Sequence, residues 1–213
     1  MSNSDDSTIK GILLGEMAVG KTNLITIASG GEFSENYEST AACSFSIKKI
    51  VIKGNEFYIQ LWDTIGQERL RTLTKLFYNN SKIVIFVYDI TRKETFDEIK
   101  NYWVKNVEEK LGKDIIKGLV ANKMDLFMKE QVTENEGKEL AQSIGALFIS
   151  TSAKTDSPKK FEDFLTKLYE QYLKKEGVDL NDPKFIKDNK NIVLNKDNNN
   201  PTGKSGNKCC LNK

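Results

Sequence analysis

The chain has 213 residues, and its 32 Lys and Arg against 30 Asp and Glu give a formal net charge of +2. Hydrophobic residues make up 38% and charged residues 29%, as in a folded domain of ordinary size. Because there is no histidine and there are only three cysteines, the composition excludes Ser-His-Asp triads, His-ligated zinc, four-cysteine metal sites and a disulfide framework. The nearly balanced charge also argues against nucleic-acid binding.

The first residues are polar and acidic, unlike a secretory signal peptide. The longest apolar run, Ile83 to Tyr88, is far shorter than the ~20 residues that cross a bilayer. We therefore expect the protein to start in the cytosol.

The composition changes near Glu176. Residues 181–213 contain nine Asn, seven Lys, three Asp and no Glu, and so few apolar residues cannot form a core. We expect an N-terminal extension at residues 1–7, one domain over residues 8–175 and a disordered, mildly basic tail over residues 176–213.

Six short runs predict six strands in chain order: Ile9 to Leu14, residues 43–52, residues 55–63, Ile83 to Asp89, Ile116 to Ala121 and Leu147 to Ser150. The second and third flank a hairpin turn at Lys53-Gly54-Asn55. We interpret the fourth and fifth as fully apolar runs, as buried parallel strands require.

Helical patterns lie between these runs. Thr133-Glu134-Asn135-Glu136 is a capping box that begins a helix, and apolar residues from Phe161 to Tyr172 recur at helical spacing. The alternation predicts an α/β fold with a mostly parallel six-stranded sheet, one antiparallel edge strand and helices on both faces. Ligands bind such sheets at the carboxyl ends of the strands.

A phosphate-binding loop follows the first predicted strand. Gly15-Glu16-Met17-Ala18-Val19-Gly20-Lys21-Thr22 fits the pattern G-x-x-x-x-G-K-[ST] and precedes a predicted helix. Its glycines let successive backbone N–H groups face a phosphate, and the helix dipole adds positive charge. Lys21 can reach the β- and γ-phosphates, and the Thr22 hydroxyl is a suitable Mg²⁺ ligand.

Four further segments occur in a fixed order: Thr40 after the first helix, Trp62-Asp63-Thr64-Ile65-Gly66-Gln67-Glu68, Asn122-Lys123-Met124-Asp125 and Ser152-Ala153-Lys154. Together with the phosphate loop they make residues 8–175 resemble the Ras-like small GTPases. The resemblance implies the P-loop NTPase fold of a small G-domain, with GTP or GDP and Mg²⁺ as ligands.

Asp125 offers two acceptor oxygens that match the N1–H and exocyclic amine of guanine, a donor pair that adenine lacks. The resemblance implies that Asn122 joins the base-binding loops and contacts N7, and that the Ala153 N–H bonds O6. The remaining base contacts implied by the resemblance are those of Phe33, Lys123, Ser152 and Lys154.

The resemblance also implies a switch. Thr40 completes the Mg²⁺ shell only with GTP, Asp63 holds Mg²⁺ through water, the Gly66 N–H contacts the γ-phosphate, and Gln67 orients the attacking water. The loop that contains Thr40 and the loop that contains Gly66 and Gln67 are both released when the γ-phosphate leaves. No arginine finger is evident in the chain, so hydrolysis should be slow without an activating protein.

Within this family the chain resembles the Rab proteins. The stretches that carry this resemblance are Gln67 to Thr74, Val87 to Thr91 and Thr151 to Lys154. Phe45, Trp62 and Phe77 align with the aromatic triad that Rabs present to effectors, although core packing is an alternative role for Trp62. The resemblance implies a GTP-controlled regulator of vesicle traffic.

The tail ends in Cys209-Cys210-Leu211-Asn212-Lys213. The resemblance implies geranylgeranyl groups on Cys209 and Cys210, and a C-a-a-X box on Cys210 alone is the alternative. Two prenyl chains anchor a protein stably, at the cytosolic face of an intracellular membrane or the plasma membrane. Expected partners are an exchange factor, a GTPase-activating protein, the Rab escort protein, the GDP-dissociation inhibitor and trafficking effectors. We expect a monomer with a cytosolic pool.

Two departures from the family pattern leave alternatives open. Met17 can crowd the γ-phosphate, and Ile65 can stiffen the loop before Gly66. A GTP-locked scaffold with little hydrolysis and a Ras-like signalling GTPase remain the alternatives to a Rab-like switch.

Overall fold

The computed structural model describes residues 8–35, 44–63 and 78–180. The chain divides into two units, and the first ends at Val178. Asp179 and Leu180 are the two described residues of the second unit.

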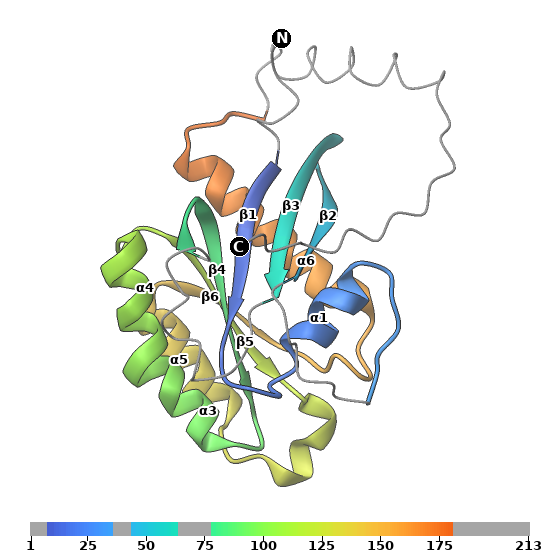
Figure 1. Ribbon diagram of the computed structural model, residues 1–213, viewed down its shortest axis with the longest axis vertical. Helices are drawn as coiled ribbons and strands as arrows, with labels where there is room; N and C mark the ends of the chain where they lie inside the picture. The colour runs from blue at the N-terminus through green and yellow to red at the C-terminus, as the bar shows by residue number, and fades with distance from the viewer. Residues whose placement is uncertain (1–7, 36–43, 64–77, 181–213) are drawn as a thin grey trace, which may run out of the picture. The chain divides into compact units, whose positions relative to one another are not determined.

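One six-stranded sheet organises the first unit (Figure 1). Its spatial order is β2-β3-β1-β4-β5-β6, in which β2 runs antiparallel to β3 and the other neighbours are parallel. This confirms the predicted sheet with one antiparallel edge strand. The strands are β1 (Thr8–Leu14), β2 (Ser44–Ile52), β3 (Asn55–Asp63), β4 (Ser81–Asp89), β5 (Ile116–Asn122) and β6 (Ala146–Ser150).

Helices cover both faces of the sheet (Figure 1). α1 (Lys21–Ala28) and α6 (Pro158–Lys175) lie on one face. The opposite face is covered by α3 (Lys93–Glu98), the π-helix η2 (Ile99–Trp103), α4 (Val104–Leu111) and α5 (Glu134–Ile144). A 3-10 helix, η3 (Met124–Lys129), follows β5. The π-turn that joins α3 to α4 has no signal in the sequence pattern.

The local predictions agree with the structure. Lys53 and Gly54 both have positive φ, at 49° and 79°, as a two-residue hairpin turn requires. The Thr133 side chain accepts from the Glu136 N–H while the Glu136 carboxylate accepts from the Thr133 N–H, so the capping box begins α5. α6 buries the predicted apolar stripe, including Phe161 and Leu168.

One strand prediction was wrong in detail. We interpreted residues 116–121 as fully apolar, but Lys117 lies within β5 and is only 5% exposed. Its Nζ donates to Glu108 Oε1 on α4 over 2.9 Å. A buried charge is tolerated where a carboxylate pairs with it, so this lysine fits a strand that the simple apolar pattern does not describe.

Candidate functional site

The loop between β1 and α1 forms the first wall of the site. Gly15, Ala18 and Gly20 have φ values of 148°, 61° and 99°. A Cβ on Gly15 would lie 2.1 Å from the Val87 carbonyl oxygen, and one on Gly20 would lie 2.3 Å from Asn122 Nδ2. Both positions therefore require glycine for space as well as for backbone conformation.

Lys21 closes this loop from inside. Its Nζ donates to the carbonyl oxygens of Gly15 and Glu16 over 2.8 and 2.9 Å. The side chain is 5% exposed, and burial lowers its pKa to about 8 although the nearby charge of Asp63 acts in the opposite direction. A buried cation at the first turn of a helix is suited to hold an anion.

Thr22 and Asp63 bring α1 to the carboxyl end of β3. The Thr22 hydroxyl donates to Asp63 Oδ2 over 2.6 Å, and Asp63 is 3% exposed. A hydroxyl and a carboxylate are hard oxygen donors, which Mg²⁺ prefers, and Mg²⁺ keeps several waters and uses few protein ligands. Within the described ranges no three His, Cys, Asp or Glu side chains gather to hold a metal.

Asn122, at the end of β5, joins the phosphate loop to the loop after β6. Its Nδ2 donates to the Val19 carbonyl over 2.7 Å, and its Oδ1 accepts from the Ala153 N–H over 3.2 Å. The side chain is 1% exposed. Both amide ends are used inside the protein, so Asn122 orders two loops from one buried position.

Asp125 and Ser152 are neighbours on these loops. The Ser152 hydroxyl donates to Asp125 Oδ1 over 2.5 Å and accepts from the Lys154 N–H over 3.1 Å. The Asp156 carboxylate accepts from the Ser152 N–H over 3.0 Å. These contacts orient the Asp125 carboxylate through its Oδ1.

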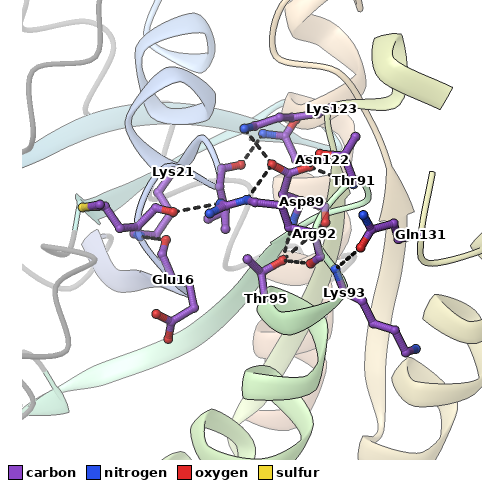
Figure 2. Close-up of polar contacts among 12 residues, drawn as sticks. Glu16, Lys21, Asp89, Thr91, Arg92, Lys93, Thr95, Asn122, Lys123 and Gln131 are labelled. Carbon is purple, nitrogen blue, oxygen red and sulfur yellow. Dashed lines mark hydrogen bonds and ion pairs between the residues drawn. The ribbon is translucent and has the colours of Figure 1, made fainter. Parts of the chain in front are cut away.

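Lys123 pairs with a residue that the sequence reasoning did not assign to the site. Its Nζ lies 2.7 Å from Asp89 Oδ2, at the end of β4 (Figure 2). Burial on its own raises the pKa of Asp89, but the bonds from Lys123 and Thr91 outweigh it and hold that pKa below its usual range. Asp89 is therefore charged at neutral pH.

The other predicted contacts lie further out. Phe33 is half-buried in the loop after α1, and Lys154 Nζ pairs with Glu35 Oε1 over 2.5 Å. Phe45 and Trp62 stack across β2 and β3 with ring centroids 5.1 Å apart. Phe45 is 50% exposed, whereas Trp62 also packs against the core, which is the alternative role considered for Trp62.

Several predicted residues lie outside the described ranges. They are Thr40, Gly66 and Gln67 of the switch, Phe77 of the aromatic triad, and Cys209 and Cys210 of the tail.

The sequence reasoning missed two further neighbours of the phosphate loop. Arg92 donates to the Met17 carbonyl over 2.9 Å, and Trp103 Nε1 donates to Glu16 Oε1 over 3.3 Å. The nearest sequence signal is the stretch Val87 to Thr91, which carries part of the resemblance to the Rab proteins and ends directly before Arg92. Trp103 carries no such signal, because helical spacing alone marks it as a core residue.

Comparison with known proteins adds independent information. Residues 10–174 match the model of the Ras family. The chain is 38% identical to Ras-related protein Rab-8B of Homo sapiens over 157 residues, which cover 74% of this chain and 75% of that protein. It is equally similar to Ras-related protein Rab-8A of Bos taurus, over 73% and 75% of the two chains, and to Ras-related protein Rab-8 of Diplobatis ommata, over 73% of each.

Proposed function

Because this chain belongs to the Ras family and is a Rab-like small GTPase, we propose that it is a GTP-controlled switch of vesicle traffic. It binds GDP and GTP, hydrolyses GTP slowly and binds effectors in the GTP state. The similarity to Rab relatives favours this function over a Ras-like signalling role.

The observation that carries the proposal is the position of Asn122. It joins the phosphate loop at Val19 to the Ala153 N–H, so phosphate binding and base binding share one buried anchor. In the proposed complex the guanine lies beside this anchor, where Asp125 accepts from N1–H and the exocyclic amine while the Ala153 N–H donates to O6. The stems of Lys123 and Lys154 flank the base, with Phe33 at its edge.

The phosphates occupy the loop of residues 15–22. The backbone N–H groups and the Lys21 ammonium hold them, and Lys21 exchanges its bonds to the Gly15 and Glu16 carbonyls for phosphate oxygens. Thr22 and Asp63 are the described residues that would hold Mg²⁺, with Thr40 as a further ligand in the GTP state. When bound, Mg²⁺ neutralises charge on the β- and γ-phosphates.

Hydrolysis needs an oriented water. We assign the orientation of this water to Gln67, and we assign a contact with the γ-phosphate to the Gly66 N–H. Loss of the γ-phosphate releases both switch segments. A GTPase-activating protein sets the lifetime of the GTP state, and an exchange factor restores the GTP state after hydrolysis.

We further propose that effectors bind Phe45 and Trp62, of which Phe45 is half exposed at the β2 edge, together with Phe77. None of the helices in the described ranges is long and apolar enough to span a bilayer. We assign membrane attachment to prenyl groups on Cys209 and Cys210, with the Rab escort protein and the GDP-dissociation inhibitor as carriers.

Nucleotide competition tests the proposal. Fluorescent GDP is bound to the full-length chain with Mg²⁺ and displaced by excess GDP, GTP, ADP or ATP. We expect displacement by the guanine nucleotides alone, and slow phosphate release when GTP is supplied. Equal displacement by ADP would contradict the proposed base recognition, and GTP binding without phosphate release would support the GTP-locked scaffold instead.

A further inference from the structure

Arg92, the residue that precedes α3, bridges two parts of the site (Figure 2). Its Nε donates to Asp89 Oδ2 over 3.1 Å, and its Nη2 donates to the Met17 carbonyl oxygen over 2.9 Å. The guanidinium thus joins the end of β4 to the middle of the phosphate loop. A planar fork can make both bonds at once, which a lysine ammonium in the same place cannot do with the same geometry.

The Met17 carbonyl controls the direction of a neighbouring donor. A trans peptide is planar, so the N–H of Ala18 points opposite to the carbonyl of Met17. Ala18 has a φ of 61°, a left-handed conformation that costs free energy for a residue other than glycine. A bond that holds the Met17 carbonyl against Arg92 therefore also holds the Ala18 N–H in its direction within the phosphate loop.

Asp89 holds the Arg92 guanidinium in a fixed position, because the Asp89 carboxylate is itself fixed by several contacts. The Asp89 side chain is 2% exposed and also accepts from the Thr91 N–H over 2.9 Å and from the Thr91 hydroxyl over 2.7 Å. Lys123 approaches the same carboxylate within 2.7 Å. The backbone of Arg92 is fixed as well, because its carbonyl accepts from the Thr95 hydroxyl over 2.7 Å.

A second contact from the same helical stretch reaches the neighbouring loop residue. Trp103 Nε1, on η2, donates to Glu16 Oε1 over 3.3 Å. Arg92 and Trp103 therefore contact two consecutive residues of the phosphate loop, Met17 and Glu16. Lys21, which belongs to the loop, binds two of its carbonyl oxygens. A loop held from both sides keeps its N–H groups in place before a phosphate arrives, which reduces the cost of binding.

We propose that Arg92 is a positioning residue of the nucleotide site, which slows the release of a nucleoside diphosphate by fixing the Met17–Ala18 peptide. The inference rests on the proposed function, since it assigns a role within that same site. Arg92 acts through the loop backbone and does not itself contact the ligand.

The test compares release of fluorescent GDP from the full-length chain and its variants. In Arg92→Ala we expect release to become about tenfold faster. This factor corresponds to the low end of the free energy contributed by a hydrogen bond from a charged donor. Lys93→Ala is the matched control, because Lys93 is the adjacent basic residue and its Nζ pairs with Glu136, away from the loop. We expect release from Lys93→Ala to match the unaltered chain.

Two further measurements separate positioning from a general loss of structure. The same factor should persist when EDTA removes Mg²⁺, because the bond from Arg92 to the Met17 carbonyl and the bond from Thr22 to Asp63 share no residue. Arg92→Lys keeps the charge but not the fork, so its release rate should lie nearer to that of Arg92→Ala than to that of the unaltered chain.

The inference is overturned by an unchanged rate in Arg92→Ala, by an equal increase in Lys93→Ala, by an increase that vanishes in EDTA, or by an unaltered rate in Arg92→Lys. Failure of the unaltered chain to bind fluorescent GDP at all would instead refute the proposed function on which the inference rests.

Discussion

The Thr22 hydroxyl donates to Asp63 Oδ2 over 2.6 Å and so joins the first turn of α1 to the last residue of β3. Two oxygen atoms that can act as metal ligands, from different elements, therefore meet beside Lys21 at the carboxyl edge of the sheet. The relationship ties the phosphate loop to the carboxyl end of β3.

If this pair holds Mg²⁺, then Thr22→Ala should weaken Mg²⁺ binding by about tenfold or more, since removing even an outer-shell partner of a metal ligand costs about that much. The expected result is a higher Mg²⁺ concentration for half-maximal slowing of GDP release. Thr22→Ser keeps the hydroxyl and serves as the control, and it should retain the unaltered Mg²⁺ requirement. Identical Mg²⁺ curves for Thr22→Ala and Thr22→Ser would refute the assignment.

Lys21 predicts a pH dependence of nucleotide binding. Burial lowers its pKa to about 8 in the protein alone, and a bound phosphate would keep the ammonium charged. Below pH 8 the lysine is already protonated, so the affinity for GDP should be constant there. Above pH 8 binding must take up a proton, and the affinity should fall by up to about tenfold per pH unit.

Calorimetric titration with GDP at pH 7 and pH 9, in buffers of different ionisation enthalpy, counts this proton. We expect no uptake attributable to Lys21 at pH 7 and uptake approaching one proton at pH 9. Affinity that stays level from pH 7 to pH 9 would contradict a lowered pKa at this position.

Asp125 should set the choice of base. In Asp125→Asn the side chain loses one acceptor, and we expect GDP affinity to fall by about 10⁴-fold, as in sites built to hydrogen-bond a donor pair. Xanthine carries an oxygen where guanine carries its amine, so the Asn amide should favour xanthosine diphosphate. Competition between the two nucleotides measures the change, and an unaltered preference for GDP would contradict the assigned role.

Gly137 offers a test of core packing behind the site. In an open helix Gly→Ala usually stabilises, but a Cβ here would lie 2.4 Å from Tyr88 Oη and 2.6 Å from Phe148 Cε2. We expect Gly137→Ala to lower the free energy of unfolding by about 1–3 kcal/mol, the usual cost of overpacking. Lys138→Ala, on the exposed face of α5, is the control for denaturant titration, and a stabilised Gly137→Ala would show that β4 and β6 yield easily.

Much of the fold followed from local patterns. The capping box at Thr133 and the turn at Lys53-Gly54 are chemical signals confined to a few neighbouring residues, and the structure confirms both. The interpretation of residues 116–121 as fully apolar was wrong because the buried charge of Lys117 is compensated by Glu108, which is nine residues away and on another element. Pairings of this kind are fixed by packing and not by pattern.

The same distinction applies to the site. The motif around Asn122 identified the right residue, but its bond to the Val19 carbonyl joins positions 103 residues apart. Arg92 was not found, because its importance comes from reaching a backbone carbonyl, and no side-chain motif marks such a partner. Sequence reasoning finds residues that recognise a ligand more readily than residues that hold a loop in place.

The most direct test of the central account is the identity of the nucleotide that copurifies with the full-length chain. The purified protein is denatured, and the released nucleotide is separated by chromatography. The account predicts GDP in a ratio near one per chain, since a guanine-selective site with working hydrolysis retains its product. An adenine nucleotide in that ratio would contradict guanine recognition by Asn122 and Asp125, and GTP in that ratio would contradict turnover.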